Sequence, residues 1–167
     1  MNSVECRQKI ELYGAGFALL SAALADLPRE AWQHRPAPAE WCIHEIVVHL
    51  ADSESMAALR ARKLITEPGS WLMGYEEARW ADALQYSAQN ADNALRIIQL
   101  VRQTTYELLR TLPDAAFDHA VRHEEYEQPY TFDMWLDIYS RHIPEHIEQI
   151  QRAYEAWRLA TQQPDET

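Results

Sequence analysis

Apolar residues recur at every third or fourth position along four long stretches of the chain, a spacing that is typical of amphipathic helices. The pattern predicts helices over residues 3–25, 39–66, 88–112 and 131–160. Helix-breaking residues follow the first three stretches: Pro28, then Pro68 with Gly69, then Pro113. We therefore expect an all-α fold, a four-helix bundle in a single domain that spans residues 1–167.

The connections between these predicted helices are unequal. A long crossover, residues 68–87, joins the second helix to the third and contains a short helical piece predicted over residues 75–84. The link before the last helix contains a helical turn predicted at residues 114–117. Thr131 is the expected N-cap of the last helix, and Asp133 lies in its first turn, where the helix dipole favours negative charge. We expect no paired strands.

Composition narrows the classes of partner. Of the 167 residues, 47% are apolar, which is enough for a core, and the net charge is -11. Nucleic acid and anionic membranes both require a basic surface, so neither is expected as a partner. No stretch approaches the ~18 uninterrupted apolar residues of a membrane span. Two cysteines make no disulfide framework, and the first residues lack the order of a signal peptide, so we expect a cytoplasmic protein.

Two histidines, His142 and His146, lie on the apolar face of the last predicted helix. At about 100° per residue they are about 40° apart, one turn above the other. Such a pair can hold one metal ion if a third ligand comes from elsewhere, or the two can be hydrogen-bonded histidines of the core. The spacing alone leaves both interpretations open. Pro144 lies between them, removes one helical hydrogen bond and is expected to kink the helix.

The second predicted helix carries His44, Glu45 and His49. The string HEIVVH is one residue longer than the HExxH zinc motif. His44 and His49 are about 140° apart around a helix and cannot share one ion. We therefore expect His44 to be solvated, and His49 to lie at the edge of the apolar face.

Three segments of the chain resemble, in order and in spacing, the motifs of the DinB-like superfamily of damage-inducible, metal-binding helical bundles. They are residues 41–54 (WCIHEIVVHLADSE), 75–81 (YEEARWA) and 141–150 (RHIPEHIEQI). The first shows the tryptophan, the glutamate and the His-Leu pair followed by acidic residues, and the last shows the closing H-x-x-x-H-x-x-Q-I motif. The chain departs from the family at Cys42, where serine or threonine is usual, and at residues 127–129, where a glycine is usual.

The resemblance implies a four-helix bundle that binds a divalent metal ion through three histidines. Residue by residue, these fall on His49, His142 and His146. Imidazole ligands suit zinc, nickel or iron alike. Three protein ligands leave open coordination positions, as in catalytic sites. We expect Glu45 to be the general base or to orient an imidazole, and Asp52 and Gln149 are further candidates for orienting the imidazoles; each of the three can instead be a solvated polar residue.

Two interpretations of the function follow. The resemblance implies a metal-dependent enzyme that activates a low-molecular-weight thiol or water against a small electrophilic substrate, as an S-transferase or a hydrolase, and it also implies a homodimer. The alternative is a non-enzymatic, stress-associated dimeric bundle in which metal binding is incidental. The fold alone does not choose between them.

Overall fold

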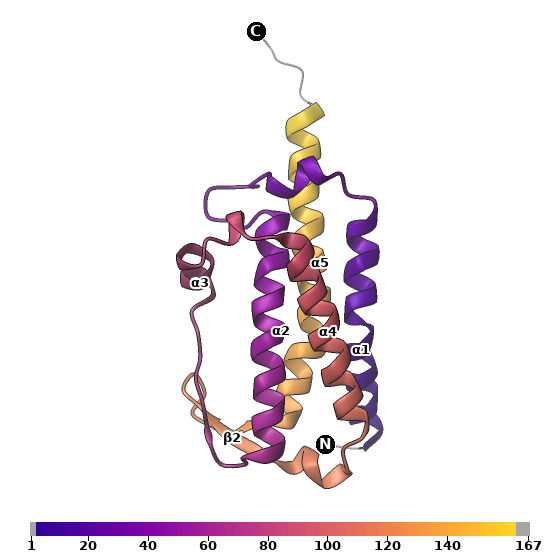
Figure 1. Ribbon diagram of the computed structural model, residues 1–167, viewed down its shortest axis with the longest axis vertical. Coiled ribbons are helices and arrows are strands. Elements are labelled where there is room, and N and C mark those ends of the chain that lie inside the picture. Colours follow the sequence, from indigo (N-terminus) through magenta and orange to yellow (C-terminus); the bar gives the residue numbers. More distant parts are fainter. Residues whose placement is uncertain (1–2, 163–167) are drawn as a thin grey trace.

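The computed structural model describes residues 3–162, and four long helices make up most of them (Figure 1). They are α1 (Ser3–Ala25), α2 (Ile43–Thr66), α4 (Ala91–Arg110) and α5 (Phe132–Gln162). The predicted all-α four-helix bundle is thus confirmed. Short 3-10 turns flank the helices: η1 (Arg29–Gln33), η2 (Tyr86–Ala88) and η3 (Asp114–Asp118).

Two pairs of successive long helices, α1 with α2 and α4 with α5, lie across the diagonal of the bundle, whereas α2 and α4 are neighbours. α1 packs against α4 and α5, and α2 packs against the same two helices. The colours of Figure 1 show α1 and α5 running in one direction and α2 and α4 in the other. The segment between α2 and α4 must therefore travel the length of the bundle, which confirms the predicted long crossover. It carries the short helix α3 (Glu77–Ala83), slightly shorter than predicted.

The two long links also form a small sheet, contrary to the expectation that no strands pair. The strand β1 (Trp71–Leu72) runs parallel to β2 (Ala120–His123), and β2 runs antiparallel to β3 (Tyr130–Thr131). Strands of two to four residues are too short to show the alternation that identifies a strand in a sequence.

The start of α2 differs from the prediction: the helix begins at Ile43, four residues after the expected start at residue 39. Cys42 is the N-cap, and a capping box links it to Glu45, whose Oε2 accepts the Cys42 N–H at 3.1 Å. Cys42 thus fills the cap position where the family usually has a hydroxyl residue. At the start of α5, the hydroxyl of Thr131 accepts the N–H of Met134 at 3.2 Å, the predicted cap.

A buried ion pair contacts all four long helices. Arg102 of α4 pairs with Glu54 of α2, and these side chains are 1% and 0% exposed. The guanidinium also donates to the carbonyl of Tyr13 on α1 at 2.6 Å and to that of Tyr139 on α5 at 2.9 Å. The Arg102 side chain fits against α1 because residue 16 is a glycine: a Cβ on Gly16 would lie 2.6 Å from the Arg102 Nε. Among the described residues, no helix is long and apolar enough to cross a membrane.

We predict that Glu54→Gln lowers the free energy of unfolding by about 3–5 kcal/mol, because it leaves the Arg102 charge buried without its partner. The matched control is Glu11→Gln, which removes an exposed carboxylate that accepts the Tyr106 hydroxyl at 2.7 Å and should cost less than about 1 kcal/mol. Urea unfolding of the three proteins makes the comparison. Similar losses in both variants would contradict the role given to the buried pair.

Candidate metal centre

Three histidines from two helices meet inside the bundle. His49 comes from the second turn of α2, and His142 and His146 come from neighbouring turns of α5, which packs against α2. One ring nitrogen from each lies within 4.8 Å of the others. The ring centroids of His49 lie 5.6 Å from His142 and 4.8 Å from His146. The structure thus brings together the three residues predicted from the sequence, with Pro144 between two of them.

Three ring nitrogens of this cluster lack protein partners. His49 is 0% exposed, and neither of its ring nitrogens has a hydrogen bond; the Nδ1 of His142 has none either. The Nε2 atoms of His142 and His146 lie 3.2 Å apart. Buried polar atoms normally have partners, because burial without one costs free energy. A set of three converging nitrogen donors fits a divalent ion such as zinc, nickel or iron.

Burial keeps the three imidazoles neutral. It lowers the pKa of His49 to about 3, with a smaller contribution from His146. Burial, and then the neighbouring histidines and Arg102, lower the pKa of His142 to about 2. Burial also lowers the pKa of His146, against an opposing hydrogen bond from Gln149. Neutral imidazole is the form that coordinates a metal ion, so the centre is in its ligand form at pH 7.

Of the three candidate orienting residues, Glu45, Asp52 and Gln149, the last contacts an imidazole of the cluster. The Oε1 of Gln149 lies 2.8 Å from the Nδ1 of His146 and accepts its proton, which leaves the Nε2 lone pair directed at the centre. Asp52 instead accepts the hydroxyl of Tyr86 at 2.7 Å. Sequence reasoning gave no place in the site to Tyr139, whose ring lies 5.9 Å from that of His142; its position one turn before His142 on the same helix face was the available signal.

The remaining predicted polar residues of α2 lie away from the cluster or at its border. The ring of His44 contacts Gln33 at 3.1 Å and the carbonyl of Gln89 at 2.8 Å, as its phase on the helix requires. Glu45 is buried, with one carboxylate oxygen on Arg35 and the other on the Cys42 N–H. Its role as a base stays a prediction.

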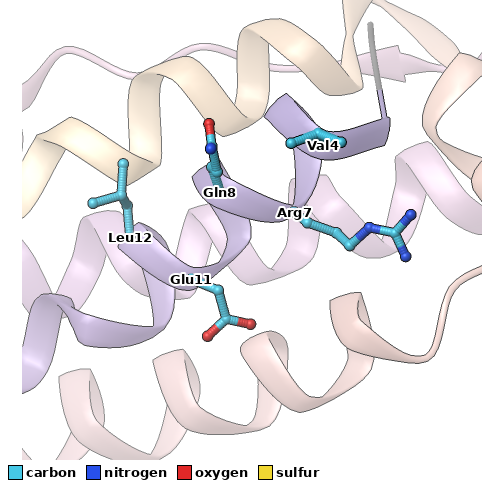
Figure 2. Close-up of a pocket in the computed structure, with 5 residues that line it drawn as sticks. All are labelled: Val4, Arg7, Gln8, Glu11 and Leu12. Atoms are coloured by element: carbon cyan, nitrogen blue, oxygen red, sulfur yellow. The ribbon is translucent and has the colours of Figure 1, made fainter.

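A polar pocket of about 450 Å³ opens beside the centre, and its polar and aromatic lining comes from Arg35, Trp41, Glu45, Asp82, Gln85 and Ser87. The ring of Trp41 lies 4.8 Å from that of His49, so Trp41 borders both the pocket and the histidines. A second hollow, lined by Val4, Arg7, Gln8, Glu11 and Leu12, lies on α1 (Figure 2). It is near the opposite end of the bundle from the start of α2 (Figure 1).

The sequence profile of the DinB superfamily matches residues 13–150, and the chain therefore belongs to this superfamily. YfiT from Bacillus subtilis is 27% identical over 110 residues, which are 66% of this chain and 62% of YfiT. A protein of Oceanobacillus iheyensis is 26% identical over 132 residues, 79% of this chain and 76% of its own. Both are named as candidate metal-dependent hydrolases.

Solved structures show the same fold. The structure of YfiT, a four-helix bundle described as unusual in topology, matches with a TM-score of 0.85 at 22% identity, over 95% of this chain and 90% of that chain. The mycothiol-dependent maleylpyruvate isomerase matches with a TM-score of 0.70 at 16% identity, over 90% of this chain and 63% of that chain. At these identities the likeness concerns the fold.

We predict that His49→Ala abolishes stabilisation by zinc or nickel, whereas His44→Ala leaves it intact. A metal ion at about a hundred times its dissociation constant adds roughly 2.7 kcal/mol to a protein that binds it only when folded. For a chain of this size, that raises the melting midpoint by about 5–11 °C. Melting curves with metal and with chelator test this, and an equal loss in both variants would mean that the ion binds elsewhere.

We also predict that the metal-free protein loses stability as the pH falls from 7 to 5. In the unfolded chain the histidines take up protons below about 6.5, while the folded cluster stays neutral. Each such histidine then costs about 2 kcal/mol over this range. Urea unfolding with chelator should show a smaller pH dependence for His142→Leu than for the wild type. His44→Ala is the control and should keep the wild-type dependence.

Proposed function

We propose that this protein is a metal-dependent hydrolase in which His49, His142 and His146 bind one divalent ion and water attacks a small electrophilic substrate. The observation that carries this proposal is the convergence of three neutral imidazoles, with both ring nitrogens of the buried His49 and the Nδ1 of His142 lacking protein partners. The names of the related proteins support the same chemistry. A divalent ion held by three neutral ligands would supply Lewis acidity, and it would lower the pKa of a bound water molecule to about 7.

Three features of the chain support this hydrolysis: the orientation of the imidazoles, a pocket for the substrate, and a proton acceptor. Gln149 fixes the tautomer of His146, and burial holds the imidazoles neutral. The polar pocket beside Trp41 gives the substrate a place next to the histidines. Glu45 lines that pocket, and each of its oxygens has a lone pair beyond the one used by Arg35 or Cys42, so we propose it as the proton acceptor.

A thiol in place of water is the second candidate. It is favoured by the shared fold of the mycothiol-dependent isomerase, whose name states its thiol dependence. Water comes first because the sequence relatives that cover most of the chain are named as hydrolases. A homodimer in the cytoplasm also stays a prediction; exposed Leu12 and Leu19 on α1 offer apolar surface for such contacts.

We predict that the protein loaded with zinc, nickel or iron hydrolyses small activated esters such as 4-nitrophenyl acetate, and that chelator or His146→Ala abolishes turnover. Glu45→Gln should lower kcat about 10²–10⁴-fold with the metal content unchanged, because it removes the base. Arg35→Gln is the matched control: it breaks the same ion pair but keeps the carboxylate.

Two outcomes would overturn parts of this proposal. Equal kcat values in Glu45→Gln and Arg35→Gln would show that Glu45 only supports the start of α2. Turnover that requires added cysteine or another low-molecular-weight thiol would favour the thiol candidate over water.

A further inference from the structure

Two buried arginines of the bundle are paired differently. Arg102 has the carboxylate of Glu54 as its counterion. Arg60 of α2 is only 9% exposed, yet among residues 3–162 no carboxylate lies within 4.0 Å of it. Its guanidinium donates to the hydroxyl of Tyr139 at 3.0 Å and to the carbonyl of Met73 at 3.2 Å, and its Nε–H has no partner. A buried cation with only neutral hydrogen-bond partners is costly, and a bound anion would relieve that cost.

Two further buried donors lack partners, and the Arg60 charge acts on both of them. His123 of β2 and Tyr130 of β3 are 2% and 1% exposed, and their rings lie 5.3 Å apart. Burial, and then the Arg60 charge, lower the pKa of His123, so its ring is neutral. The Nδ1 of His123 accepts the N–H of Glu125 at 3.3 Å, which places the proton on Nε2. Neither that Nε2–H nor the hydroxyl of Tyr130 has a hydrogen-bond partner.

This cluster adjoins the histidine centre. Arg60 follows His49 by eleven positions, so both lie on one face of α2, about 20° apart. Tyr139, which accepts from Arg60, also packs its ring 5.9 Å from that of His142. The ring of Tyr75 from the crossover lies 5.8 Å from the Arg60 guanidinium and covers it. The Arg60 cluster and the histidine centre therefore share Tyr139 as a common neighbour.

We propose that Arg60, His123 and Tyr130 form a subsite that binds a carboxylate group of the substrate. Calling the ligand a substrate rests on the proposed hydrolase function; the anion site itself does not. Two or more N–H groups of one guanidinium match the geometry of a carboxylate, and the neutral donors complete its hydrogen bonds. The nearby carboxylates of Glu77 and Glu125, on the exposed side, favour a singly charged carboxylate over a doubly charged phosphate.

The first test uses the full chain with chelator, so that no metal ion can bind the anion. Sodium acetate should raise the melting midpoint above that in sodium chloride of equal ionic strength, and sodium phosphate should raise it less. Arg60→Gln should lose the acetate effect. The matched control Arg62→Gln removes an exposed charge of the same helix and should keep the effect. An acetate effect of equal size in both variants would overturn the proposal.

The second test removes the hydroxyl of Tyr130, which makes no hydrogen bond within the protein. Tyr130→Phe should leave the midpoint without acetate unchanged or raised, because the deleted hydroxyl is buried and has no partner. It should also weaken acetate binding about tenfold. The control is Tyr126→Phe, since the ring of Tyr126 packs against that of Tyr130. This variant should change neither the melting midpoint nor acetate binding. Unchanged acetate binding in Tyr130→Phe would contradict the subsite.

The same measurement on His49→Ala separates this inference from the proposed function. The acetate effect should persist in that variant, since the subsite does not use the histidines. If the acetate effect is present but no metal ion binds the wild type, the hydrolase proposal fails and the anion site stands. If metal binds and esters are hydrolysed without any acetate effect, the anion site fails and the hydrolase proposal stands.

Discussion

The buried pair of Glu54 and Arg102 fixes the axial positions of the four helices, and the histidine site depends on those positions. Glu54 follows His49 by five residues on α2, and the carbonyl that Arg102 binds on α5 belongs to Tyr139, three residues before His142. A slip of α2 past α5 by one helical turn, about 5.4 Å, would separate the ligands. Because Arg102 binds both Glu54 of α2 and the Tyr139 carbonyl of α5, the same slip would break one of these two buried interactions, and loss of the ion pair is the larger penalty. The ion pair therefore specifies the register that the site requires.

Around this pair, the bundle contains buried polar groups of two kinds. The first kind is satisfied within the chain: the Arg102 guanidinium is bound by Glu54 and by two carbonyls. The second kind is not satisfied, and it comprises atoms of His49, His142, Arg60, His123 and Tyr130, among others. Each unsatisfied group costs stability in the free protein. Such costs are expected where a ligand completes the bonds, and these five residues fall into two groups, one around the candidate metal centre and one around Arg60.

Helical periodicity was enough to predict the four helices and to place His49 on the side facing α5, with His44 on another side. It failed at the start of α2, because the Cys42-x-x-Glu45 capping box was not recognised as a helix start. Helical phase does place Arg60 on the face of His49 and Arg62 about 200° away from Arg60, but it did not predict that Arg60 is buried without a carboxylate partner. The contacts of Arg60 with Met73 and Tyr75 come from the crossover, whose path the sequence pattern does not predict.

The parallel direction of the neighbouring helices α2 and α4 (Figure 1) gives the long crossover its place in the site. Because α2 and α4 run in the same direction, the chain must return along the bundle after α2 ends (Figure 1). On this path Tyr75 covers Arg60 near one end of the candidate site, and Tyr86 binds Asp52 and packs toward Trp41 near the other. A direct hairpin between antiparallel neighbours would leave this face of α2 without a wall. The topology thus builds, from one connection, the cover over both the carboxylate subsite and the histidine centre.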